Sequence, residues 1–389
     1  MKRRQFFKVS GVGSITSVLS GHFSMTFLGC SQSEDATFYV GTYTRGESEG
    51  IYRCTMNPVS GAIQLKDVTR GVDNPSFLAV DQNQRYLYAV NETSRFEGNP
   101  SGALSAFRID RRTGSLELIN QQPSHGTDPC HLIVDQSNRF ALVANYSSGS
   151  ASVFPIGQNG ELGDSTDVVQ HQGKSIHPRR QQGPHAHCIT LDASNRFAFV
   201  ADLGLDKIMI YRFNDTSGKL IPHVEPWCPI KAGAGPRHFA FHPDGETAYV
   251  INELDSTLTV FAYDATNGML KEMQTLSTLP EGFTGENSCA EVQVAPSGRF
   301  VYGSNRGHDS IVVFAVDPNT GYLSFVQHQS TLGRTPRHFT IDPTGRFLLA
   351  ANQDSDTIVV FGVDSESGIL TPTGFQIEVP VPVCLQFVT

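Results

Sequence analysis

The sequence lacks several features by which common classes of protein are recognised. It has no cysteine pair in the C-x-x-C spacing of structural zinc sites, no H-E-x-x-H motif and no G-x-S-x-G nucleophile turn. These absences argue against a zinc site and against an acyl-enzyme mechanism. The chain is also short of positive charge, with 29 Lys and Arg against 38 Asp and Glu and a net charge of -9. A nucleic acid or an anionic membrane is therefore not expected as the main partner.

Residues 1–35 are predicted to be an export signal and are left out of the fold. The run RRQFFK at residues 3–8 resembles a twin-arginine signal. Residues 9–28 are only mildly apolar and contain several Ser, Thr and Gly, so a membrane span is not expected there. The following FLGC resembles a lipobox ending at Cys30, although Phe27 stands where Leu is usual. A periplasmic protein and a lipoprotein anchored to the membrane through Cys30 are both open alternatives.

One pattern recurs six times in the rest of the chain. Its copy at residues 235–261, GPRHFAFHPDGETAYVINELDSTLTVF, contains two alternating apolar runs joined by a Pro-Asp-Gly turn. Each copy continues into a third strand and then a Gly-led fourth strand. Four short strands per repeat are typical of a propeller blade. The copies begin at Pro75, Pro129, Ala186, Pro236, Cys289 and Pro336.

The turn in this copy predicts which residues face each other across the hairpin. If the turn is centred on Pro-Asp-Gly, His238 lies opposite Ile251, and Pro236 lies opposite Glu253. Arg237, His238 and Glu253 are then gathered at one end of the hairpin. An Arg, a His and a carboxylate in one place could carry out ester chemistry.

The two ends of the chain supply a seventh blade. Residues 381–387 are predicted to form a first strand with no second strand after it, and residues 38–43 a second strand with no first strand before it. Sharing one blade between the termini closes the ring and removes exposed sheet edges. The sequence therefore predicts an all-β, seven-bladed β-propeller over residues 36–389, with the last blade closed by both chain termini. An open pair of β-sandwiches is the alternative.

In a propeller, the starts of the first strands and the ends of the second strands open on one face. Polar residues that converge on one face are the default hypothesis for a binding site. Glu253, Glu291 and Arg306 depart from the repeat, so the fold does not need them, and they are the better candidates for chemistry. The face collects Glu92, His131, Asn145, His185, His187, Asp202, Arg237, His238, Glu253, Glu291, Arg306, His308, Arg337, His338, Asn352 and Gln353. By contrast, the recurring post-turn arginines are expected to be structural: Arg139, Arg196, Arg299 and Arg346.

Neither metal nor disulfide is expected in the propeller. His185 and His187 alternate on one predicted strand and could ligate a metal, but no clear third ligand accompanies them. Six cysteines follow Cys30, an even number that could pair in an exported protein. Four of them fall at the starts of inner strands in different blades, so free or buried thiols are expected: Cys130, Cys188, Cys289 and Cys384.

Five short motifs resemble the signature stretches of the seven-bladed β-propeller lactonases, the bacterial 6-phosphogluconolactonase-like family. They are GPHAH at residues 183–187, GPRH at 235–238, NEL at 252–254, SNRGHDS at 304–310 and ANQDS at 351–355. The resemblance covers nearly everything from Thr37 onward, and the family includes fungal carboxymuconate-lactonising enzymes. It implies a catalytic His, either His185 or His187. It also implies an Arg and a Glu sixteen residues apart, matched by Arg237 and Glu253, and a later Arg, for which Arg306 fits best.

The expected function is hydrolysis of a sugar lactone by direct attack of water, without a cofactor. Glu253 or His187 is the general base, with His185 as the alternative histidine, and Arg237 stabilises the oxyanion. Arg306 and Arg337 hold a phosphate or carboxylate of a small, anionic lactone. The remaining predicted substrate-binding residues are His238, His338, Glu291 and His131.

Three questions stay open at this point. Phosphorylated sugars belong to the cytoplasm, whereas the signal predicts export, so the substrate could be an unphosphorylated lactone. A non-enzymatic propeller that binds a carbohydrate or protein is one alternative function, and a muconate-type lactonising cycloisomerase is another. The chain is expected to act as a monomer.

Overall fold

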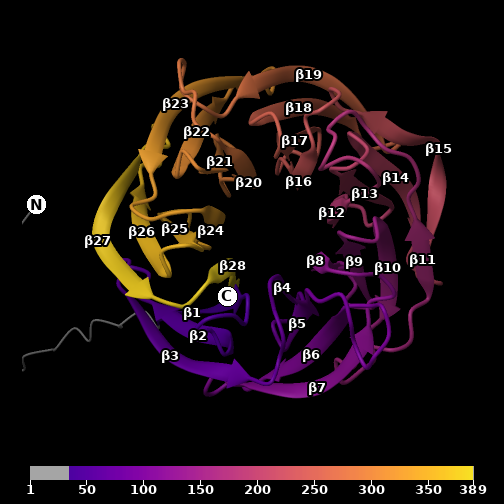
Figure 1. The fold of residues 1–389 in the computed structure, drawn as a ribbon. Coiled ribbons are helices and arrows are strands. Elements are labelled where there is room, and N and C mark those ends of the chain that lie inside the picture. Colours follow the sequence, from indigo (N-terminus) through magenta and orange to yellow (C-terminus); the bar gives the residue numbers. More distant parts are fainter. Residues whose placement is uncertain (1–34, 389) are drawn as a thin grey trace, which may run out of the picture. The chain divides into compact units, whose positions relative to one another are not determined.

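The computed structural model describes residues 35–388 as seven four-stranded antiparallel sheets arranged around an axis (Figure 1). The predicted all-β, seven-bladed propeller is confirmed. The predicted export signal and Cys30 lie outside the described residues. Within residues 35–388, no helix is long and apolar enough to cross a bilayer.

Each blade places its first strand next to the axis and its fourth strand on the rim. The first strands are β28 (Pro382–Val388), β4 (Leu78–Val80), β8 (Pro129–Val134), β12 (Ala186–Leu191), β16 (Pro236–Phe241), β20 (Ser288–Val294) and β24 (Pro336–Ile341). The second strands are β1 (Ala36–Thr42), β5 (Tyr86–Asn91), β9 (Phe140–Asn145), β13 (Phe197–Asp202), β17 (Thr247–Asn252), β21 (Phe300–Arg306) and β25 (Phe347–Asn352).

The outer half of each blade follows the same order. The third strands are β2 (Gly50–Met56), β6 (Ala103–Ile109), β10 (Ser150–Pro155), β14 (Lys207–Asn214), β18 (Thr257–Asp264), β22 (Ser310–Val316) and β26 (Thr357–Val363). The fourth strands are β3 (Ile63–Arg70), β7 (Leu116–Pro123), β11 (Asp167–Gln170), β15 (Lys219–Pro229), β19 (Met269–Ser277), β23 (Leu323–Ser330) and β27 (Leu370–Glu378).

The ring is closed by pairing between the two ends of the chain. β1 pairs with β28 in antiparallel register, with Phe38 opposite Phe387 and Val40 opposite Leu385. Both ends of the chain therefore meet in one sheet, as the sequence predicts. The seventh blade is therefore a complete four-stranded sheet, in the order β28-β1-β2-β3.

The core lies between neighbouring blades rather than within any one of them. Phe199 on β13 stacks on Phe239 of the next blade, with ring centroids 5.5 Å apart, and both belong to one buried cluster. A blade has two apolar faces and buries each of them against a neighbour. Burial of apolar area at about 25 cal/mol per Å² thus holds adjacent blades together and fixes the ring.

The four recurring arginines connect neighbouring blades on one face of the ring. This face carries the turns between the first and second strands and is called the turn face below. Each directly precedes a second strand and reaches the turn between the third and fourth strands of the next blade. Arg139 pairs with Asp215 at 2.9 Å, and Arg196 donates to the Ala265 carbonyl at 2.7 Å. Arg299 contacts Glu366 and Arg346 contacts the Pro58 carbonyl in the same way. Their predicted structural role is confirmed.

One predicted register is wrong by one residue. His238 does lie opposite Ile251, but Pro236 pairs with Asn252 instead of Glu253, because a β-bulge at Arg237 inserts an extra residue into β16. A bulge leaves one residue out of the ladder and re-aims its side chain. The first strands of three other blades carry a bulge at the equivalent position, at Cys130, His187 and Arg337.

The cysteines of the propeller are unpaired, as predicted. Cys54, Cys130, Cys188, Cys289 and Cys384 are buried free thiols, and Cys228 is half-buried. Burial raises the pKa of the Cys188 thiol to about 12, so it stays protonated at neutral pH.

Candidate active site

Two adjoining cavities open on the face where the second strands end. The inner cavity has a volume of about 270 Å³, and the outer one, of about 610 Å³, forms its mouth. They share Arg180, Glu253, Ser288 and Arg306, so they form one opening toward the axis. The inner cavity is lined by Glu92, Cys130, Tyr146, Arg180, His187, Glu253, Ser288, Arg306 and Arg337.

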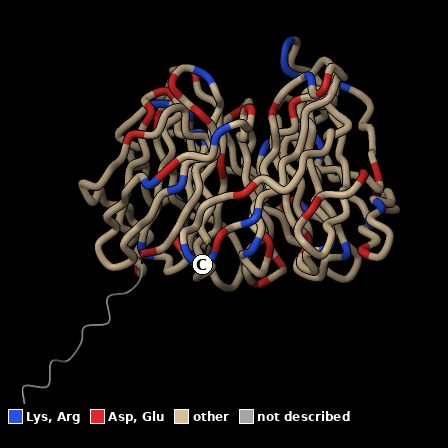
Figure 2. Tube along the Cα trace, turned by 90° about the horizontal axis from the view of Figure 1, so that it is seen from below, with Lys and Arg blue, Asp and Glu red and all other residues tan. Residues whose placement is uncertain are grey.

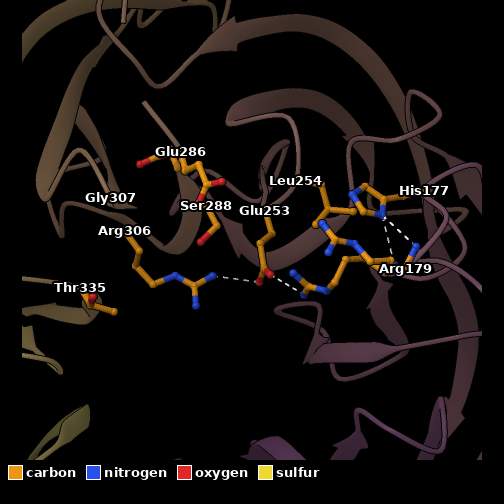
Figure 3. A pocket seen from close by; sticks show the side chains of 11 residues that line it. His177, Arg179, Glu253, Leu254, Glu286, Ser288, Arg306, Gly307 and Thr335 are labelled. Carbon is orange, nitrogen blue, oxygen red and sulfur yellow. Dashed lines mark hydrogen bonds and ion pairs between the residues drawn. The ribbon is translucent and has the colours of Figure 1, made fainter. Parts of the chain in front are cut away.

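Glu253 stands between three guanidinium groups. Its Oε2 pairs with Nε of Arg237 and with Nη2 of Arg306, both at 3.0 Å. Its Oε1 accepts a bond of 2.6 Å from Nη2 of Arg180. Figure 3 shows Glu253 and Arg306 facing each other across the mouth, with His177 and Arg179 beyond. Both carboxylate oxygens are therefore occupied by arginine.

These contacts fix the charge of the Glu253 carboxylate. Burial raises its pKa, but Arg306, Arg237 and Arg180 together outweigh burial and lower the pKa to about 2. Burial, together with Arg306 and Arg337, lowers the pKa of Arg237 to about 10. Glu253 is ionised at neutral pH and has little tendency to accept a proton.

His187 is the histidine of the H-x-H pair that reaches the cavity. Its ring is buried, and its Nδ1 is enclosed without a hydrogen-bond partner, which leaves Nε2 as the nitrogen that can meet a ligand. Burial lowers its pKa well below the usual value, and the charge of Arg237 lowers it further. His187 is therefore a neutral imidazole at neutral pH.

His185 lies outside the cavity lining. Its ring stacks on Tyr146 with 4.6 Å between centroids, and its Nδ1 lies 3.1 Å from the Tyr146 carbonyl oxygen. The bulge at His187 breaks the simple alternation that would have placed both rings on one face. Among residues 35–388, no group of three or more His, Cys, Asp or Glu side chains is arranged to hold a metal ion.

Arg306 and Arg337 both line the inner cavity. Arg306 donates from Nη2 to the Cys289 carbonyl at 2.7 Å, and its buried Nε has no hydrogen-bond partner. Arg337 donates from Nη2 to the Tyr43 hydroxyl at 2.8 Å and lies over that ring. Each guanidinium retains donor groups that a bound anion could use.

Four predicted binding residues lie deeper along the axis, and none of them lines either cavity. His238 Nδ1 and His338 Nε2 share one oxygen of Glu291, at 3.0 and 3.2 Å. His131 packs against His238 with centroids 5.3 Å apart, and Phe77 contacts all three rings. Burial lowers the pKa of His338 to about 4 and raises that of Glu291. This group fills the channel beneath the cavity.

The bulges explain why some predicted site residues line the inner cavity and others lie in the channel beneath it. The side chain of the unpaired residue at a bulge lies on the cavity side. The side chain of the next residue along the strand lies in the channel. Cys130, His187 and Arg337 line the inner cavity, whereas His131, His238 and His338 follow a bulge and lie below. Arg237 is the exception, since it lies behind Glu253 and donates to the Ala290 carbonyl at 2.7 Å.

Sequence reasoning missed Arg180, Tyr146, Tyr43 and Ser288. Arg180 belongs to residues 171–185, a connection between β11 and β12 without regular structure. His171 pairs with Asp202 at 2.6 Å and Ser175 donates to Asp206 at 2.5 Å, so the connection is anchored to the next blade. Its length and its two adjacent arginines, Arg179 and Arg180, were the available signals.

Comparison with known proteins identifies the family. Residues 37–387 match the family described as "Lactonase, 7-bladed beta-propeller", and the chain belongs to it. The chain is 38% identical over 349 residues to the 6-phosphogluconolactonase of Bacillus subtilis, covering 90% of this chain and 97% of that protein. It is 35% identical to the 6-phosphogluconolactonase of Formosa agariphila, covering 78% of this chain and 86% of that protein. The structure of the periplasmic gluconolactonase of Pseudomonas aeruginosa is similar with a TM-score of 0.87 and 36% identity, covering 92% of this chain and 99% of that one.

The distribution of charged residues over the rest of the ring does not distinguish the face on which the cavities open. Figure 2 shows Lys and Arg interspersed with Asp and Glu along the whole ring. The net charge of -9 would repel an anion at long range. Attraction of an anionic ligand must therefore come from the arginines gathered inside the cavity.

Proposed function

We propose that the chain hydrolyses a sugar lactone to the aldonic acid, by direct attack of water and without a cofactor. The observation that carries this proposal is the neutral imidazole of His187, in a small cavity that also exposes Arg306. A lactone is a cyclic ester, and its hydrolysis needs an activated water and a positive group near the carbonyl oxygen. Family membership supports the same class of reaction.

His187 is the better general base of the two candidates. Glu253 has a pKa of about 2, and arginines occupy both of its oxygens. His187 has an unprotonated ring nitrogen available to accept a proton from water. General base catalysis of this kind contributes about 10²–10⁴-fold.

Arg306 is the better candidate than Arg237 for stabilising the oxyanion. Arg237 lies behind Glu253 and donates to the Ala290 carbonyl, whereas Arg306 lines both cavities. One preorganised donor of this kind typically contributes about 3 kcal/mol to the transition state. Glu253 then acts by holding Arg237, Arg306 and Arg180 in place.

The substrate is proposed to carry its own negative charge or a dense set of hydroxyl groups. Arg337 and Arg306 face the inner cavity, and Arg179 stands at the mouth, where a phosphate on the far end of a lactone could bind. Export through the segment 1–35 would favour an unphosphorylated lactone. The relative from Pseudomonas aeruginosa is called a periplasmic gluconolactonase, and this name supports that choice.

The test is hydrolysis of freshly prepared 6-phosphogluconolactone and gluconolactone by the purified protein, after subtraction of spontaneous opening. Turnover that is lost in a His187→Ala variant supports the proposal. Preference for the plain lactone supports a periplasmic substrate, and preference for the phosphorylated one supports cytoplasmic function. No turnover of either overturns the proposal and leaves a binding propeller or a cycloisomerase, which muconolactones would then distinguish.

A further inference from the structure

The inner cavity contains a second carboxyl group, opposite Glu253. Glu92 follows β5 and lines the cavity three blades away from Glu253 around the ring. Its oxygens accept the Tyr43 hydroxyl at 2.9 Å, and Oε2 also accepts Ser76 Oγ at 2.5 Å. The two carboxyl groups thus line the same cavity from opposite sides of the ring.

The neighbours of Glu92 differ from those of Glu253. No arginine donates to Glu92 directly, since Arg337 reaches it only through the Tyr43 hydroxyl. Arg337 donates to the phenol oxygen, so the phenol hydrogen is left to point at Glu92. Burial raises the pKa of Glu92 above its usual value, whereas the pKa of Glu253 is lowered to about 2. Two carboxyl groups whose pKa values are driven apart can take different roles in one reaction.

Opening a sugar lactone requires more than attack by water. The leaving group is an alkoxide, which is far more basic than water at neutral pH and needs a proton as the ring C–O bond breaks. His187 takes a proton from the attacking water and could return it only if its ring also reached the leaving oxygen, whereas a separate acid on another side of the ligand needs no such double contact. Among the residues that line the inner cavity, Glu92 is the one carboxyl group that forms no ion pair or hydrogen bond with an arginine.

We propose that Glu92 is the general acid of the lactonase reaction, held in position by Tyr43 and Ser76. This inference rests on the proposed hydrolytic function. The water oxygen bonds to the carbonyl carbon while its proton moves to His187. The ring C–O bond then breaks, its electron pair stays on the ring oxygen, and the Glu92 proton goes to that oxygen. The proton on His187 returns through solvent to Glu92, and the new carboxylic acid ionises.

The role of the leaving group makes the proposal testable. A Glu92→Gln variant should lose roughly 10²-fold or more in kcat on gluconolactone, whose leaving group is an alkoxide. On a lactone with a phenolate leaving group, such as dihydrocoumarin, the loss should be only a few-fold because that group leaves without a proton. The alkaline limb of the wild-type pH profile should also be absent in the variant. Glu117→Gln, on the outer strand of the same blade, is the matched control.

Each outcome decides the question. An equal loss on both lactones, or an unchanged alkaline limb, overturns the role of Glu92 while leaving the hydrolytic function intact. No loss on gluconolactone does the same. If the wild-type protein opens no sugar lactone, the proposed function fails and this inference with it. A Tyr43→Phe variant tests the same step when Glu92→Gln folds poorly: it keeps the carboxyl but loses the bond that orients it, and a smaller loss confined to gluconolactone is expected.

Discussion

Arg237 and Glu253, sixteen residues apart in the sequence, form a buried ion pair with 3.0 Å between Nε and Oε2. The pair joins the bulge of β16 to the residue that follows β17. Arg306 and Arg180 complete the environment of the same carboxylate. A negative charge at this point holds together three positive groups that would otherwise repel one another.

Replacement of Glu253 by Gln should therefore harm both stability and catalysis. Removing one partner of a buried ion pair typically costs about 3–5 kcal/mol, because the remaining charge is left uncompensated. Urea unfolding and steady-state kinetics measure the two effects on the same preparation. Glu246→Gln, in an exposed turn of the same blade, is the control. An unchanged unfolding midpoint would contradict the holding role.

The two histidines of the H-x-H pair should differ sharply in function. His187→Ala should lower kcat by about 10²–10⁴-fold, as expected for loss of a general base. His185→Ala should lower it only slightly, because His185 stacks on Tyr146 outside the cavity lining. Rates of lactone opening for both variants test this, with thermal melts to confirm folding. A larger loss in His185→Ala would reverse the assignment.

The pH dependence of kcat/KM should reflect the environment of His187. Its pKa lies well below 6.5 because of burial and the nearby charge of Arg237. The base is therefore already neutral at pH 7 and stays neutral as the pH falls through 6.5. Activity should be lost only at lower pH, as His187 becomes protonated. An acid limb at or above pH 6.5, in rates followed from about pH 4 to about pH 8, would point to another base.

The turn face makes an independent prediction about stability. The buried carboxylate of Asp135 accepts the backbone N–H groups of Arg139 and Phe140 at 2.7 and 2.8 Å, and the Asn195 side chain at 2.9 Å. Burial raises its pKa, but these bonds and one from Ser137 outweigh burial, and the pKa lies below 3.8. Asp135→Ala should cost about 1–3 kcal/mol at pH 7, because buried N–H groups lose their acceptor.

The sign of the pH effect follows from the lowered pKa. Ionised Asp135 stabilises the fold fully above its unfolded value of 3.8, and this contribution disappears as the pH falls through the lower, folded value. Denaturant melts of wild type and Asp135→Ala should therefore differ at pH 7 and converge at strongly acidic pH. A constant difference across that range would contradict the assignment.

The repeat carried most of the information about the fold. Every blade buries both of its faces against a neighbour with the same pattern, so six copies and two half-blades at the termini predict the ring. The face that carries the two cavities was also predictable, because Glu253 and Arg306 end second strands or follow them directly. These features depend on alternation, which is visible in the sequence.

The sequence did not predict in the same way whether a side chain lines the cavity or lies in the channel beneath it. A bulge adds one residue without changing the apolar alternation around it, and this separates His187 from His185 and places His238 in the channel. Arg180 lies on an irregular connection whose path depends on distant contacts, such as the Gln181 amide on the Leu203 carbonyl at 2.8 Å. Neither effect has a periodic signal.

The direction of β1 also decides how the molecule would stand on a surface. Asp35 is bonded to Asn57 in a turn between a third and a fourth strand, whereas Tyr43, just past the other end of β1, contacts the residues of the cavity. The two ends of β1 therefore lie on opposite faces of the ring, with Asp35 on the turn face. If the turn face rested on a surface, the opening of the two cavities would point away from it into the aqueous compartment, where a water-soluble ligand could enter unobstructed.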